Sequence, residues 1–166
     1  SKLVIAARGP ARRELARARP SSLALPEGFG GVELVMPGVL ALAGPRFEQP
    51  EQGYASAEQL AAALTNHTGN EAALTGIALI VLCDDPAFVA ARLANFAWVT
   101  FTRSNPSHDV HGVAATIEHK HWGCRGPLII DARIKPWHAP PLVEDPEVTR
   151  KVDALAARGG PLHGLW

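Results

Sequence analysis

Two kinds of apolar pattern alternate along this chain. Short runs of consecutive apolar residues predict strands at 2–7, 32–37, 39–44, 77–83 and 127–132. Apolar residues at three- and four-residue steps predict helices at 86–103 and 146–158, while strong helix formers and clustered basic residues predict shorter helices at 57–64 and 12–18. Loops are predicted at 20–31, 45–53 and 65–73. Because the strand runs lack polar alternation, we expect both faces of the sheet to be covered.

Local signals mark where these helices begin and end. Asp85 precedes a proline, as expected of an N-cap residue followed by proline at the first helical position, and Asp145 does the same. Ser56 and Gln59 have the spacing of a capping box, which predicts that the alanine-rich helix begins there. The Ser-Asn-Pro sequence after Arg103 predicts a helix end, because the residue before a proline avoids helical backbone angles.

Strands interleaved with helices indicate an α/β fold. We predict a single domain with a mixed, largely parallel sheet covered by helices, ending in a C-terminal amphipathic helix. A length of 166 residues is typical of one domain and suffices to bury a substantial core. Within the chain we distinguish an α/β part at 1–144 from a C-terminal helix and tail at 145–166.

Charge and composition exclude several classes of protein. Sixteen basic and sixteen acidic residues leave no formal net charge, which argues against binding to nucleic acid or to an anionic membrane. The longest apolar runs are far shorter than the roughly 20 residues of a membrane span. Cys83 and Cys124 make no disulfide framework, and the first residues lack the apolar core of a secretory signal. We expect a soluble, cytoplasmic protein.

Most residues able to carry chemistry lie between Arg103 and His138, where five of the seven histidines fall. His119, His121 and Cys124 are potential zinc ligands, but structural zinc sites normally use two paired-ligand motifs and only one is suggested here. We favour the interpretation in which Cys124 is a small buried apolar residue and the histidines line a surface loop. A catalytic Cys/His pair stays open, since it requires a lowered thiol pKa and an orienting group that a sequence does not reveal.

Other candidates have structural explanations. Asp84 and Asp85 could serve as acid and base, but Asp85 is already explained as a helix cap, so we favour structural roles for both. Arg103 near a helix C-terminus is favoured by the helix dipole alone. Trp98 could stack on a planar ring, although a helical tryptophan is more often part of a core or interface. The chain has no glycine-rich phosphate loop of the Walker or dinucleotide type.

Four segments together form a pattern found in a known family. They are the two aspartates at 84–85, FAWVTFTRSNPSHD at 96–109, GPLIIDARIKP at 126–136 and EDPEVTRKVDAL at 144–155. The most specific element consists of Trp98, Thr102, Arg103, Pro106 and Asp109. This pattern resembles the C-terminal portion of the UbiD-type decarboxylases. HKHWGC at 119–124 and ARGGPLHGLW at 157–166 are similar to the branch that acts on small heteroaromatic acids such as pyrrole-2-carboxylate.

The resemblance implies a reversible decarboxylase of (hetero)aromatic acids that uses prenylated FMN, with a divalent metal and K⁺, all bound mainly outside this chain. Family members place their catalytic arginine and glutamate upstream of the matched region, so no catalytic residue is expected here. The family often has a glycine-histidine pair where this chain has Ala55 and Ser56, so no flavin-phosphate role is transferred. The isolated chain is expected to be inactive.

The resemblance also implies partners and substrate contacts. The C-terminal portion of these enzymes mediates homo-oligomerisation and closes over the pocket of the N-terminal flavin-binding domain, near a small aromatic acid substrate. The substrate-binding candidates are His119, Lys120, His121 and Arg103, because histidine, lysine and arginine can hydrogen-bond an aromatic carboxylate.

Two functions of other classes stay open. A non-enzymatic oligomerisation or interaction module is favoured by the apolar helix faces and by the terminal amphipathic helix, which could pair around a symmetry axis. A metal-dependent hydrolase that uses the histidine-rich segment is less favoured.

Overall fold

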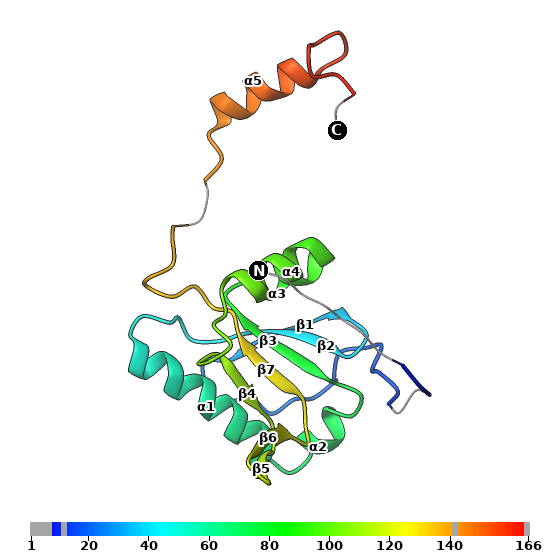
Figure 1. Ribbon diagram of the computed structural model, residues 1–166, viewed down its shortest axis with the longest axis vertical. Helices are drawn as coiled ribbons and strands as arrows, with labels where there is room; N and C mark the ends of the chain where they lie inside the picture. Colours follow the sequence, from blue (N-terminus) through cyan, green and yellow to red (C-terminus); the bar gives the residue numbers. More distant parts are fainter. Residues whose placement is uncertain (1–7, 11–12, 141–142, 165–166) are drawn as a thin grey trace.

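A five-stranded mixed sheet forms the middle layer of the fold (Figure 1). The computed structural model describes residues 8–10, 13–140 and 143–164. The strands of the sheet are β1 (Gly30–Met36), β2 (Val39–Ala43), β3 (Leu79–Cys83), β7 (Leu128–Asp131) and β4 (Val110–Gly112), in that spatial order. The central three strands are parallel, and the outermost strands, β1 and β4, each pair antiparallel with their neighbour. The predicted α/β fold with a mixed sheet is therefore confirmed.

Helices cover both faces of this sheet. Leu40, Leu42, Ile80 and Leu82 pack against helix α1 (Pro50–Asn66), which is followed by the short helix α2 (Asn70–Ala73). The alternate residues Ala41, Val81 and Cys83 pack against helices α3 (Pro86–Ala91) and α4 (Leu93–Thr102) on the opposite face. Because successive side chains of a strand point to opposite faces, a strand between two helical layers is apolar at every position.

The segment between β4 and β7 was expected to be a loop but forms a hairpin. Strand β5 (Ala115–Glu118) pairs antiparallel with β6 (His121–Cys124). Its two-residue turn, His119 and Lys120, has positive φ at both positions, as a type I′ turn requires. Neither residue is one of the asparagine or glycine residues that usually signal such a turn, which explains why the sequence did not reveal it.

Three predicted helices differ from the structure. The alanine-rich helix begins at Pro50, with Gln49 as its N-cap, so the capping box at Ser56 was wrong, and the Ser56 hydroxyl instead donates to the Gly53 carbonyl within the helix. Pro50 stands at the first turn, where a proline needs no amide partner. The helix predicted over 86–103 is interrupted at Arg92, whose backbone is extended.

The basic segment at 12–18 was also predicted wrongly, since its described residues 13–18 are not helical. The amide of Ala16 donates to Gly76 O, and Ala16 O accepts from the Gly38 amide. These long-range bonds bind the segment to the start of β2 and to the approach to β3, which outweighs its local helix propensity. The strand predicted at 2–7 lies outside the described residues.

The C-terminal helix α5 (Pro146–Ala156) confirms the prediction from Asp145, whose side chain accepts from the amides of Glu147 and Val148. Asp85 likewise caps α3 by accepting from the Phe88 amide at 2.9 Å. Helix α5 lies apart from the sheet and its covering helices in Figure 1, and it buries none of its residues. The boundary between 144 and 145 as a division into two parts stays a prediction. None of the described helices combines the length and apolar content needed to cross a bilayer.

Candidate functional site

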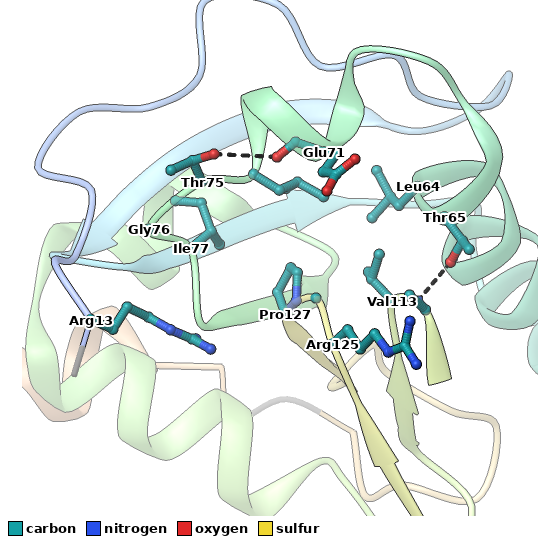
Figure 2. Close-up of a pocket in the computed structure, with 13 residues that line it drawn as sticks. Arg13, Leu64, Thr65, Glu71, Thr75, Gly76, Ile77, Val113, Arg125 and Pro127 are labelled. Atoms are coloured by element: carbon teal, nitrogen blue, oxygen red, sulfur yellow. Dashed lines mark hydrogen bonds between the residues drawn. The ribbon is translucent and has the colours of Figure 1, made fainter. Parts of the chain in front are cut away.

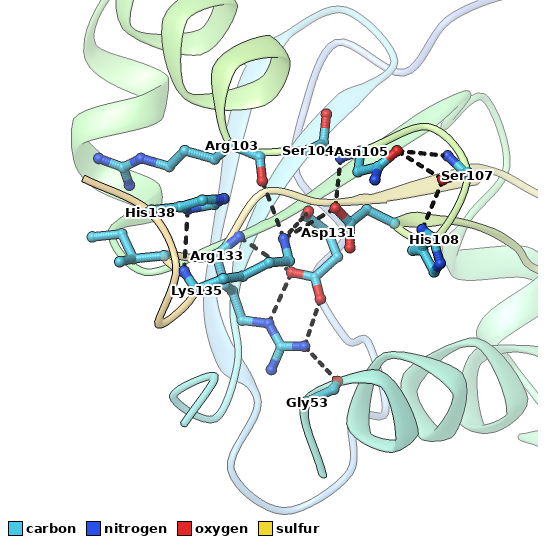
Figure 3. Close-up of polar contacts among 12 residues, drawn as sticks. Gly53, Arg103, Ser104, Asn105, Ser107, His108, Asp131, Arg133, Lys135 and His138 are labelled. Atoms are coloured by element: carbon cyan, nitrogen blue, oxygen red, sulfur yellow. Dashed lines mark hydrogen bonds and ion pairs between the residues drawn. The ribbon is translucent and has the colours of Figure 1, made fainter. Parts of the chain in front are cut away.

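The carboxyl ends of the three parallel strands meet at one edge of the sheet. Ala43 pairs with Cys83, and Leu82 pairs with Asp131, so the residues that follow β2, β3 and β7 emerge side by side. In open α/β sheets, ligands bind in the crevice outside the carboxyl ends of the strands. A group of buried and partly buried polar residues gathers at this edge (Figure 3).

A fully buried ion pair lies at the end of β7. The Arg133 guanidinium binds Asp131 through two bonds, Nε to Oδ1 at 2.9 Å and Nη2 to Oδ2 at 2.6 Å, and both side chains have no solvent exposure. The remaining donors of Arg133 reach the Pro45 carbonyl at 2.7 Å, the Ser56 hydroxyl at 2.9 Å and the Gly53 carbonyl at 2.8 Å. The bidentate pair with Asp131 orients the guanidinium, and its other bonds join the end of β7 to the loop after β2 and to helix α1.

A second buried ion pair lies beside the first. Lys135 Nζ is 3.2 Å from Asp109 Oδ2 and donates to the carbonyls of Arg103 at 3.1 Å and Asp131 at 3.0 Å. Asp109 Oδ2 also accepts from the Asn105 amide at 2.6 Å. Asp109 Oδ1 is buried and has no hydrogen-bond partner among the described residues. Lys135 thereby fastens the loop between α4 and β4 to the end of β7.

Arg103 occupies the solvent-facing side of this network. Its Nη1 lies 3.4 Å from Asp84 Oδ2, and its guanidinium carbon lies 5.0 Å from the centre of the Trp98 ring. Asp84 Oδ2 accepts from the Ile134 amide at 2.8 Å, which supports the structural role expected for Asp84. Because this ion pair is partly exposed, Arg103 keeps donor capacity for an anion.

Two hollows open from this edge of the sheet. The larger has a volume of about 700 Å³ and is lined by residues that include Arg46, Phe47, Asp84 and Lys135. The other, about 460 Å³, is lined by residues that include Trp98, Thr102, Arg103, Trp137 and His138, and we call it the Arg103 hollow. Trp98 and Trp137 are about half exposed there. An indole face beside a guanidinium suits a planar ring that carries a carboxylate.

Burial and neighbouring cations favour the neutral form of His138 in the Arg103 hollow. Burial lowers its pKa most, and the charges of Lys135 and Arg103 lower it further. Its Nδ1 lies 3.2 Å from the Lys135 amide, as an acceptor. Tyr54, on the α1 side of the sheet, has its pKa raised by burial and by Asp109 and Asp131.

The pKa of His111 is lowered, chiefly by burial. A histidine whose pKa is lowered in the folded state binds a proton more readily in the unfolded chain. Its contribution to stability is therefore fully present above the pKa of the unfolded chain, about 6.5, and is lost as the pH falls below that value. We expect the free energy of unfolding, measured by urea titration, to fall between about pH 7.5 and pH 5.5. His111→Gln should reduce that slope, with His138 supplying the remainder. An identical slope in wild type and variant would contradict this.

The structure separates the residues predicted to bind substrate. Arg103 lies at the carboxyl ends of the parallel strands, whereas His119, Lys120 and His121 lie exposed on the β5–β6 hairpin, which adjoins the opposite end of β7 (Figure 1). Substrate binding by either group stays a prediction. The described residues contain no group of three or more histidine, cysteine, aspartate or glutamate side chains placed to hold a metal, and the Cys124 thiol donates to Gly126 O.

Sequence reasoning missed the pairing of the buried charges. Asp131, the last residue of β7, alternates with Arg133 and Lys135 along the sequence, and in an extended chain this two-residue spacing places all three side chains on one side. That signal could have shown that they act together. Their partners Asp109 and Ser56 come from distant segments, which only the fold brings close.

The buried carboxylates of this site do not form a site for a divalent cation. The two buried carboxylates, Asp109 and Asp131, are already paired with Lys135 and Arg133, so neither is free to bind a divalent cation. We therefore assign no step of metal chemistry to these two carboxylates.

No family model matches this chain. It is 37% identical over 73 residues to an uncharacterized protein of Chlamydia muridarum and 32% identical over 74 residues to an uncharacterized protein of Chlamydia trachomatis serovar D. These matches span 44% and 45% of this chain but only 12% and 13% of the two relatives.

Among solved structures, the chain is similar to the vanillic acid decarboxylase of Sedimentibacter hydroxybenzoicus in open form, with a TM-score of 0.42 and 16% identity, over 76% of this chain and 28% of that one. A second structure of that open form, with truncated ShVdcD, gives a TM-score of 0.40 and 16% identity over 70% of this chain and 26% of that one. Likeness at these scores does not establish a family.

Proposed function

We propose that this chain is the C-terminal lobe of a UbiD-type, prenylated-FMN-dependent decarboxylase of (hetero)aromatic acids. In this proposal it supplies self-association and part of the rim of the substrate pocket, and an N-terminal flavin-binding domain supplies the reacting groups. The sequence resemblance motivates the proposal. The arrangement of the residues that carry the resemblance supports it.

The observation that carries the proposal is that three of the four segments with the resemblance, 84–85, 96–109 and 126–136, form one unit. The segments 96–109 and 126–136 are joined by Lys135, which binds both Asp109 and the Arg103 carbonyl. Buried charges of this kind hold a loop in one position, because removing either partner would leave the other unpaired. The network therefore fixes Arg103 and Trp98 at the edge of the sheet.

The Arg103 hollow has the chemistry that an aromatic acid requires. A guanidinium can bind a carboxylate through two parallel hydrogen bonds, and an indole can stack on an aromatic ring. Among the predicted candidates, Arg103 has this aromatic surrounding. His119, Lys120 and His121 extend into solvent, where a partner domain would have to complete a pocket.

Self-association is proposed from the apolar face of α5. Val148, Val152 and Leu155 recur at helical spacing and are 54%, 40% and 44% exposed. Helix α5 buries none of its own residues. A partner that covered its apolar face would remove this surface from water and stabilise the helix. We propose a second copy of this chain as the cover. The same observation favours the second candidate function, a non-enzymatic oligomerisation module.

The test uses the tryptophans as reporters of the two possible rims. Pyrrole-2-carboxylate is titrated into the ¹⁵N-labelled chain while the indole N–H signals are followed by NMR. We expect those of Trp98 and Trp137 to shift, and that of Trp122 on the hairpin to stay in place. Arg103→Met should abolish the shifts, whereas Arg92→Met, an exposed arginine of the same helical layer, should leave them unchanged.

Each other outcome would count against part of the proposal. A shift of Trp122 alone would move the rim to the hairpin candidates, and no shift at any indole would remove the substrate role. The enzymatic assignment is tested separately with the natural gene product, purified from cells that supply prenylated FMN. It should carry flavin and release carbon dioxide from an aromatic acid, and a flavin-free protein would contradict the assignment.

A further inference from the structure

A separate hollow lies at the opposite edge of the sheet, where the parallel strands β3 and β7 begin. It has a volume of about 420 Å³, within the usual range for small-molecule sites. Five separate segments of the chain line it, including the end of α1, the approach to β3 and the turn before β7 (Figure 2). Neither the resemblance nor the proposed function assigns it a role.

Part of the wall of this hollow is apolar, and two arginines lie at its edge. Leu64, Leu74, Ile77 and Val113, all core residues, contribute the apolar part. Arg13 and Arg125 lie on either side of Pro127 in Figure 2. Glu71 is the acidic residue of the lining, and it lies on the far side of the hollow from both arginines in this view.

Both guanidinium groups keep unused donor capacity. Arg13 is exposed, and none of the ion pairs among the described residues includes it. Arg125 approaches Glu118 only at 3.9 Å, with both side chains largely exposed, and such pairs contribute little. The positive charge of Arg13 also acts on the half-buried Cys124, where it opposes the rise in pKa that burial causes.

The rim is held by hydrogen bonds between separate segments of the chain, so the hollow exists without a ligand. The Thr65 hydroxyl accepts from the Ala114 amide at 2.8 Å, and Gly126 N donates to Val113 O at 3.0 Å. The segment that carries Arg13 is fixed by the bond from Ala16 N to Gly76 O. A side chain at Gly76 would displace this segment, since a Cβ there would lie 2.7 Å from Ala16 N.

We propose that this hollow binds a small organic carboxylate with an apolar body. Arg13 and Arg125 hold the carboxylate, because charge-assisted bonds from arginine to a carboxylate are the strong ones. The apolar body lies against Leu64, Ile77 and Val113, where it leaves water. Glu71 on the far side disfavours a second negative charge on the ligand, so the hollow selects monocarboxylates over dicarboxylates.

The test is an NMR titration of the full ¹⁵N-labelled chain with hexanoate. We expect saturable shifts of the Gly76, Ala114 and Gly126 amides, and weaker binding of both 1-hexanol, which lacks the charge, and adipate, which has a second one. The double variant Arg13→Gln/Arg125→Gln should lower the affinity for hexanoate about tenfold or more, because charge-assisted bonds are lost. The control Arg17→Gln/Arg92→Gln removes the same charge at exposed positions and should bind as wild type.

Several results would overturn the inference. These are equal binding of hexanol and hexanoate, unchanged affinity in the Arg13/Arg125 double variant, and absence of shifts at the three amides. Both arginines are exposed, so the amide spectrum of the double variant should show an intact fold. The test does not depend on the decarboxylase proposal, since the Arg103 hollow lies at the other edge of the sheet.

Discussion

Replacement of Arg133 by methionine is expected to lower the free energy of unfolding by about 3–5 kcal/mol, the usual cost of removing one partner of a buried ion pair. The change leaves the Asp131 carboxylate buried without a counter-charge. It also removes the donors that satisfy the carbonyls of Pro45 and Gly53. The measurement is equilibrium unfolding in urea at neutral pH, followed by tryptophan fluorescence.

Two further variants give this prediction its controls. Arg19→Met breaks an exposed ion pair with Glu33 and should change stability by no more than about 0.5 kcal/mol. The double variant Asp131→Leu/Arg133→Met removes both buried charges and should be more stable than Arg133→Met alone. If Arg133→Met unfolds at the same urea concentration as Arg19→Met, the network does not hold the strand ends together.

The second large effect is expected from Val152→Glu, which should convert a self-associated chain into a monomer. Val152 is central among the exposed apolar residues of α5, and a glutamate there would place a charge in the proposed contact between copies. Because α5 contributes nothing to the buried core, the thermal unfolding of the rest of the fold should not change. Light scattering coupled to size-exclusion chromatography measures the mass directly.

A matched control for this variant lies on the opposite side of the same helix. Ala154→Glu introduces the same charge with little change in helix propensity and should leave the mass of the assembly unchanged. A monomeric wild-type chain at all concentrations, or dissociation by both variants alike, would remove α5 as a contact between copies.

The sequence was most informative where local chemistry decides the structure. The strands around Leu42, Val81 and Ile129 were predicted because a strand buried on both faces is apolar throughout. The helix starts after Asp85 and Asp145 were predicted because a capping carboxylate acts on amides of the next turn.

What the sequence did not reveal depends on contacts between distant residues. The break at Arg92 carries no proline or glycine, and the Phe88 carbonyl is satisfied there by the Asn95 side chain at 2.8 Å. Apart from Asp131, the partners of Arg133 come from residues 77 to 88 positions away. The candidate site was found in part: Arg103 was named, whereas His138 beside it received no role.

The turn of the β5–β6 hairpin has an energetic consequence. Left-handed backbone geometry costs about 1–2 kcal/mol of conformational free energy for each residue other than glycine, because the Cβ approaches the following carbonyl oxygen. His119 and Lys120 both adopt this geometry, with φ of 50° and 68°. Asparagine-glycine at these positions would make a more stable hairpin. The tip of the hairpin thus carries an imidazole and an ammonium group, although turn stability alone favours neither histidine nor lysine at these positions.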